Sequence, residues 1–271
     1  MIQENLKFLQ DNVKYMGFAD DTLSGKIAKN MEQGFPEFTL KTESEFNNKK
    51  MQGELYFRKS DKSDMYFFNR YTADLVNNTT ARSQTFLIDN GKGITFKEAF
   101  NLLEGRAVHK ELTNKDQQKY HAWLQLDFEN KDKYNNYEVK RYTDNYGFDL
   151  GGVVRTFPVK ELDKEDDAKK LMTSLQKGNV QSVTIMKNGT PEKMFMEASP
   201  QWKTMNLYDA HMKPLSREQK QGYMLTRLEG PAEKKATKQE NTREEKQVSK
   251  QTNGLLEKKR ERSNRKGVSM T

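Results

Sequence analysis

The sequence predicts an α+β protein, built mainly from antiparallel sheets with a few short helices and ending in a disordered C-terminal tail. Three observations indicate this class. Apolar residues recur at helical spacing in a few short segments, and they alternate with polar residues in several others. Residues 229–271 carry very few apolar side chains, so they cannot bury enough surface to offset the entropy of ordering them.

Two segments carry the clearest helix signals. The first follows Thr95, which forms a capping-box pattern with Glu98, and it ends at Gly105. The second begins after Asp163, the expected cap, and ends at Gly178. Further helices are expected over residues 2–16, 23–31 and 216–228.

The strand signals are strongest where a turn separates two alternating segments. The polar stretch 59–64 lies between two such segments and predicts a β-hairpin. Asn188 and Gly189 tolerate the positive φ of a tight turn, and they predict a second hairpin over residues 181–197. Further strands are expected over residues 39–46, 83–88, 120–129, 137–142 and 202–208. The aromatic residues of these strands, Trp202 among them, are assigned to the core.

Charge and composition suggest three parts: an N-terminal α+β module over 1–90, a second α+β module over 91–228, and a disordered basic tail over 229–271. The net charge of the chain is +8, of which the tail carries +5. The surplus positive charge therefore belongs mostly to the tail, and the two modules are close to balanced.

The sequence contains no recognisable catalytic or cofactor motif. There is no cysteine, and this excludes disulfides, thiolate metal sites and cysteine nucleophiles. The three histidines lack the spacing of a helical zinc pair, and no phosphate-binding glycine loop or G-x-S-x-G turn is present. We therefore expect no metal, no cofactor and no enzymatic activity.

The end of the tail is the first candidate site, because it concentrates positive charge. Six basic residues occur within residues 258–266. A basic arm of this kind contacts phosphates and raises the affinity for DNA or RNA without reading sequence. The candidate contacts are Lys258, Lys259, Arg260, Arg262, Arg265 and Lys266.

The first hairpin is the second candidate, because it combines aromatic and basic residues. Aromatic side chains on a sheet can stack on bases while neighbouring cations hold phosphates. Its candidate contacts are Arg58, Lys59, Lys62 and Arg70. The competing interpretation is that Phe57, Phe67 and similar residues form core and the remaining ones are solvated.

Two other functions remain open. A protein-interaction module would bind a partner through the aromatic hairpin or through the strand 194–196. An enzyme without a recognisable motif would need a deep pocket with convergent polar groups. The N-terminus lacks the pattern of a signal peptide, and no apolar run is long enough to span a membrane. We expect a cytoplasmic location and no contact with a membrane.

Several longer segments also resemble known sequences. They are FRKSD (57–61), SDMYFFN (63–69), FKEAFNLLEGR (96–106), AWLQLDF (122–128), YGFDL (146–150) and PQWKTMNLYD (200–209). Together they are similar to uncharacterised domain families in proteins of conjugative transposons and related mobile elements from Bacteroides-type bacteria. The resemblance covers about residues 35–225. It implies a cytoplasmic accessory protein of a bacterial mobile element and brings no catalytic residue with it.

Overall fold

Three antiparallel sheets and a few short helices make up the part of the chain that the structure describes, and this confirms the α+β class. The computed structural model describes residues 3–76, 81–89 and 92–225. The sheets contain five, three and three strands. The predicted tail and its six candidate contacts between 258 and 266 lie outside the described residues.

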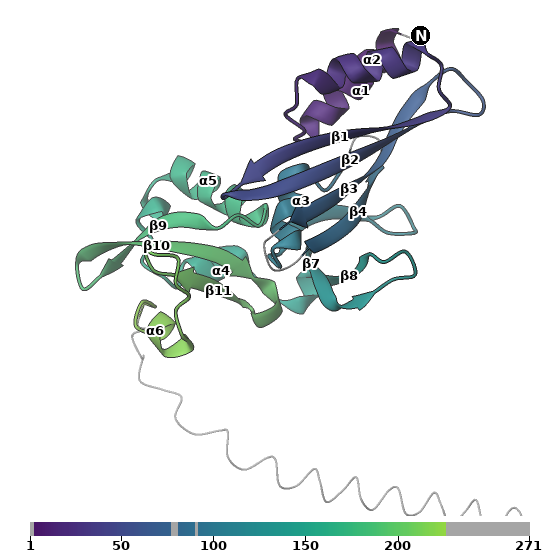
Figure 1. Cartoon of the computed structure of the whole chain (residues 1–271). Helices are drawn as coiled ribbons and strands as arrows, with labels where there is room; N and C mark the ends of the chain where they lie inside the picture. Colours follow the sequence, from purple (N-terminus) through teal and green to yellow (C-terminus); the bar gives the residue numbers. More distant parts are fainter. Residues whose placement is uncertain (1–2, 77–80, 90–91, 226–271) are drawn as a thin grey trace, which may run out of the picture. The chain divides into compact units, whose positions relative to one another are not determined.

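The N-terminal part is a five-stranded sheet covered on one face by helices (Figure 1). Its strands follow one another in chain order: β1 (Glu37–Phe46), β2 (Lys49–Lys59), β3 (Tyr66–Val76), β4 (Ala81–Asp89) and β5 (Lys92–Gly93). The first two helices are α1 (Gln3–Tyr15) and α2 (Thr22–Glu32), and both were expected. The alternation in β1 to β4 sends one set of side chains into the core and leaves the other set on an outer face.

A helix and a three-stranded sheet follow. The helix is α3 (Phe96–Leu103), and the strands are β6 (Val108–Thr113), β7 (Lys119–Lys131) and β8 (Tyr137–Thr143). The capping box of Thr95 and Glu98 is present as expected. Gly105 has a φ of +90° directly after the helix, where a residue with a Cβ would be strained.

The C-terminal part repeats the order of a helix and a three-stranded meander. Its elements are η1 (Asp144–Tyr146), α4 (Leu150–Val154), η2 (Lys160–Asp163), α5 (Glu165–Gln176), β9 (Gln181–Lys187), β10 (Thr190–Ser199), η3 (Pro200–Trp202), β11 (Thr204–Tyr208) and α6 (Arg217–Gln221). The Asn188-Gly189 turn joins β9 to β10 as predicted, and both residues have positive φ.

Three expectations for this part are wrong. Asp163 does not cap α5, because it ends the 3-10 turn η2 and Lys164 takes the cap position without a side-chain hydrogen bond. The last helix stops at Gln221, and the end predicted for it at 228 lies outside the described residues. Trp202 is not a core residue, since 73% of its surface is exposed.

Two hydrophobic cores hold these elements together. The first extends from Leu6 to Leu126, so it continues past residue 90, where the sequence suggested a boundary. The second is formed mainly by residues from Leu150 to Leu207, together with Ala107 and Trp123. It also contains both methionines of segment 194–196, which are therefore unavailable for docking a partner.

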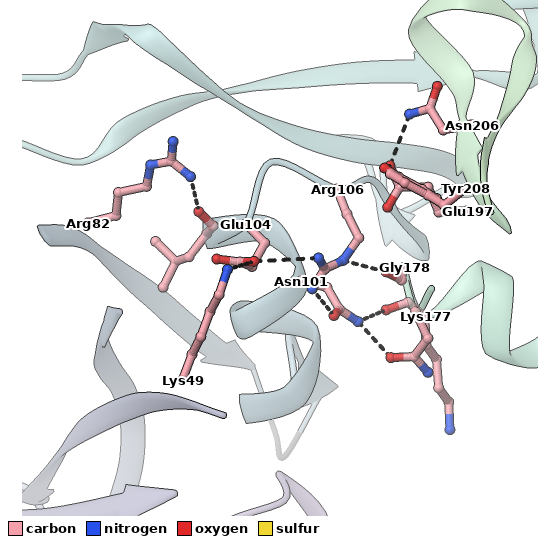
Figure 2. Close-up of polar contacts among 12 residues, drawn as sticks. Lys49, Arg82, Asn101, Glu104, Arg106, Lys177, Gly178, Glu197, Asn206 and Tyr208 are labelled. Carbon is pink, nitrogen blue, oxygen red and sulfur yellow. Dashed lines mark hydrogen bonds and ion pairs between the residues drawn. The ribbon is translucent and has the colours of Figure 1, made fainter. Parts of the chain in front are cut away.

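A buried polar network connects α3 to the end of α5 (Figure 2). The Asn101 side-chain amide donates to the carbonyl of Lys177 at 2.6 Å, and Nε of Arg106 donates to the carbonyl of Gly178 at 3.0 Å. Arg106 also donates to Oδ1 of Asn101 at 2.8 Å. These bonds satisfy carbonyl groups that α5 leaves free at its C-terminal end, and they link the two cores.

No helix within the described ranges is both long enough and apolar enough to cross a lipid bilayer.

Candidate functional site

The predicted hairpin forms from β2 and β3, and it brings two of the four candidate cations together. The register pairs Tyr56 with Arg70 and Arg58 with Phe67. Paired residues share a face of the sheet, and here it is the outer face. The guanidinium carbon of Arg70 lies 4.6 Å from the centre of the Tyr56 ring, a distance typical of a cation–π contact.

This outer face is hollowed into what we call the hairpin groove. The groove has a volume of about 520 Å³ and is lined by Glu37, Phe38, Thr39, Tyr56, Phe57, Arg58, Asn69 and Arg70. Glu37 gives this groove a carboxylate, and Tyr56 and Phe57 are the hairpin aromatics among its lining residues. Phe57 is only 2% exposed and belongs to the core, as the competing interpretation expected, whereas Phe67 is 42% exposed.

Acidic residues of the β2–β3 loop neutralise two of the hairpin cations. The Arg58 guanidinium lies 3.2 Å from a carboxylate oxygen of Asp61, and Nζ of Lys59 lies 2.7 Å from Oδ1 of Asp64. The hydrogen bond from Lys59 lowers the pKa of Asp64, and the same bond raises the pKa of Lys59. Lys62 lies in this exposed loop, outside the groove. The hairpin is therefore a weaker phosphate site than its basic residues suggest.

A second groove lies at the opposite end of the described chain, around Trp202. We call it the Trp202 groove. Its volume is about 590 Å³, and it is lined by Phe157, Trp202, Thr204, Asn206, Arg217, Lys220, Gln221 and Met224. None of these eight described residues carries a carboxylate. The groove thus combines an exposed indole, two cations and two side-chain amides.

Local backbone geometry explains why Trp202 faces solvent. Strand β10 ends at Ser199, and the 3-10 turn that follows begins with Pro200, which cannot donate to a sheet ladder. Lys203 then adopts a φ of +51° before β11 begins. The turn and this left-handed residue interrupt the alternation of the strand, so Trp202 is not placed on the inner face.

One side of the short helix α6 forms a wall of the groove. Arg217, Lys220 and Gln221 follow the spacing i, i+3 and i+4, which places them on one side of α6, and Met224 lies in the turn that follows the helix. Nζ of Lys220 also donates to the carbonyl of Met205 in β11 at 3.4 Å. The helix is therefore fixed against the strand that carries the opposite wall.

A further aromatic and a further cation lie beside the same turn. The hydroxyl of Tyr146 donates to the carbonyl of Gln201 at 2.7 Å. Nζ of Lys203 lies 4.6 Å from the centre of the Tyr146 ring. The centre of the Tyr142 ring lies 4.9 Å from the centre of the Tyr146 ring. These contacts extend the aromatic and basic surface from Trp202 towards the end of β8.

Hydrogen bonds to the carboxylate of Glu197 order the polar side chains of β11 beside the groove. Glu197 in β10 faces Asn206 in β11 and is only 7% exposed. Its Oε1 accepts hydrogen bonds from Nδ2 of Asn206 at 2.9 Å and from the hydroxyl of Tyr208 at 2.8 Å (Figure 2). Burial, followed by the neighbouring carboxylate, raises the pKa of Tyr208. The phenol therefore stays protonated and donates to Glu197 at any ordinary pH.

Two of the histidines, His109 and His121, lie on the paired strands β6 and β7. His109 and His121 stack at 5.3 Å, and burial lowers the pKa of His109. Within residues 3–76, 81–89 and 92–225, no group of three or more acidic or histidine side chains is arranged to hold a metal ion.

Comparisons with protein-family models, curated proteins and solved structures give no match for this chain.

Proposed function

We propose that this chain is a non-enzymatic protein that binds single-stranded nucleic acid, DNA or RNA, with little dependence on sequence. The observation that carries the proposal is the Trp202 groove, in which an exposed indole lies beside two cations and none of the described lining residues carries a carboxylate. Proteins that bind single strands combine these two parts, aromatic faces that stack on bases and cations that follow the phosphates.

The groove has room for a base. Its volume of about 590 Å³ lies in the range of pockets that hold small molecules. Arg217 and Lys220 lie on the same wall, where they can reach the phosphates on either side of a base stacked on Trp202. Tyr146 and Lys203, which contact each other beside the groove, supply a further aromatic side chain and a further cation for the next nucleotide.

The basic residues after the groove add to the proposed affinity. The segment 229–271 is covalently continuous with the groove and holds a net charge of +5. Cations tethered next to a first contact act at a high effective concentration. We assign sequence-independent phosphate contacts to its cluster from Lys258 to Lys266.

The hairpin groove is given a smaller part in this function. Arg70 lies over the Tyr56 ring there, and Arg58 and Lys59 are already paired with acids. The resemblance to mobile-element proteins supports an accessory role of this kind in the bacterial cytoplasm.

The proposal is tested by the affinity of the full chain for a fluorescein-labelled single-stranded 12-mer, measured by anisotropy. Trp202→Ala is expected to weaken binding about 5- to 150-fold, because a stacked base contributes about 1–3 kcal/mol. Phe67→Ala is the matched control, since it removes an exposed aromatic residue from the hairpin. Equal affinities for wild type and Trp202→Ala would overturn the proposal.

The contribution of the basic segment is tested separately by salt. Removing residues 229–271 should flatten the plot of log affinity against log salt concentration, because fewer counterions are released on binding. Identical salt dependence for the truncated and full chains would show that the segment makes no phosphate contacts.

A further inference from the structure

The first strand of the five-stranded sheet has a free edge. β1 stands at the end of the strand order and pairs with β2 alone (Figure 1). A two-residue turn joins the two strands, and its residues Asn47 and Asn48 both have positive φ. Such a turn is flanked by a hydrogen-bonded pair, here Phe46 and Lys49, and bonded and non-bonded pairs alternate from there. The even-numbered residues of β1 therefore bond to β2.

The odd-numbered residues of β1 direct their backbone groups away from β2. The amide of Lys59 donates to the carbonyl of Pro36 at 2.8 Å, which confirms that even positions face β2. Within the described residues, no other segment bonds to the outward-facing N–H and C=O groups. No bulge interrupts the register, so these groups form one continuous row. The residues of this row, all with exposed side chains, are Glu37, Thr39, Lys41, Glu43 and Glu45.

A second copy of the chain carries a strand whose charges fit this edge. Two copies related by a twofold axis would pair β1 with itself in antiparallel order, with outward-facing residues opposite each other. Two registers of this kind keep all but one of the ten residues of β1 in the overlap. One places Lys41 opposite Lys41 and Glu37 opposite Glu45, so like charges meet. The other places Lys41 opposite Glu43 and Thr39 opposite Glu45, so each lysine meets a carboxylate.

We propose that the chain forms a twofold symmetric dimer through β1, with Lys41 of each copy opposite Glu43 of the second copy. The two five-stranded sheets then become one continuous sheet. Residues 39, 41, 43 and 45 each exchange backbone bonds with a partner, which gives about eight hydrogen bonds across the axis. This dimer does not depend on the function proposed above.

The central lysine decides which partner the edge accepts. A lysine in an edge strand commonly prevents pairing with other strands. The side chain of Lys41 is 84% exposed and lies 3.9 Å from a carboxylate oxygen of Glu54, so it is free to turn towards a closer acid. The edge therefore selects a strand with a carboxylate opposite Lys41, as the second copy offers. A single pair of strands buries a small area, and we expect a dissociation constant in the micromolar range.

Sedimentation equilibrium of the full chain, from about 1 µM to about 1 mM, tests the dimer and its register. Wild type is expected to show a reversible equilibrium between monomer and dimer. Lys41→Glu should raise the dissociation constant about tenfold or more, because two attractive pairs become repulsive. Adding Glu43→Lys to the same chain restores opposite charges and should return the wild-type value. Chains with Lys41→Glu should also form a heterodimer with chains that carry Glu43→Lys.

A proline tests the backbone bonds separately from the charges. Thr39→Pro removes an outward-facing N–H without changing the net charge, and an edge strand tolerates proline at such a position. It should abolish the dimer, whereas Thr39→Ala should retain it, and circular dichroism checks that both variants fold. A wild type that stays monomeric at every concentration overturns the proposal. So does a dimer that Lys41→Glu leaves unchanged, or a charge swap that fails to restore association.

Discussion

The hairpin groove and the Trp202 groove contain similar residue types but differ in what surrounds them. In the hairpin groove the aromatic rings are mostly core, and two hairpin cations form ion pairs with Asp61 and Asp64. In the Trp202 groove the indole is exposed, and the lining residues that the structure describes carry no carboxylate. Residue type alone therefore does not define a nucleic-acid surface, because the neighbouring charges decide whether a cation is available to phosphate.

The largest expected difference between the two regions concerns stability. Phe57→Ala should lower the free energy of unfolding by about 3–5 kcal/mol, because it leaves a cavity among stacked rings in the first core. Trp202→Ala should change it by less than about 0.5 kcal/mol, since its ring is largely exposed. Urea denaturation of both variants measures the contrast. A large loss of stability in Trp202→Ala would mean that the indole packs against the body.

Removing positive charge should weaken single-strand binding more at the Trp202 groove than at the hairpin groove. Replacing Arg217 and Lys220 with alanine should weaken single-strand binding roughly tenfold and lower the salt slope by about 1.4, at 0.7 per phosphate contact. Replacing Arg58 and Arg70 in the same way removes an equal charge and should have a much smaller effect. Comparable losses from the two double variants would indicate that only net charge matters.

Neutralising the acids of the hairpin loop should increase the affinity for single strands. Asp61→Asn with Asp64→Asn should release Arg58 and Lys59 and raise the affinity of the chain about twofold to fivefold. Glu43→Gln with Glu45→Gln, on the exposed face of β1, changes the net charge equally and serves as the control. An equal gain in both double variants would show a general electrostatic effect, without a role for the loop acids.

The smallest effect concerns the titration of Asp64. Lys59 lowers the pKa of this carboxyl in the folded chain, so the pair contributes stability above the ordinary aspartate range. That contribution is lost as the pH falls through the lowered pKa. An NMR titration of the Asp64 carboxyl carbon should give a midpoint below the ordinary value, and Lys59→Ala should return it. An unchanged midpoint in this variant would disprove the pairing in solution.

Local signals were sufficient to predict most of the fold. Thr95 and Glu98 form a capping box whose atoms are three residues apart, and Asn188-Gly189 forms a turn that needs no distant partner. The hairpin of β2 and β3 was also predicted from alternation alone. Such signals are local because the interacting groups are neighbours in sequence.

The candidate site was less predictable, because it depends on contacts between distant segments. Trp202 leaves the core only because the turn and Lys203 redirect the chain. The last helix ends early where the hydroxyl of Tyr223 donates to Glu192 and the backbone of Leu225 donates to the carbonyl of Thr156. The one local signal that could have found the wall of the groove was the helical spacing of Arg217, Lys220 and Gln221.

Tryptophan fluorescence tests the central claim most directly, because the chain contains only two tryptophans and Trp123 is buried. Titration with an unlabelled single-stranded oligonucleotide should quench the long-wavelength emission of Trp202 with a saturable, salt-sensitive curve. Trp202→Phe should still bind, since it keeps an aromatic face, but it should show no quenching. Binding detected by anisotropy while the emission of Trp202 stays constant would contradict stacking in this groove.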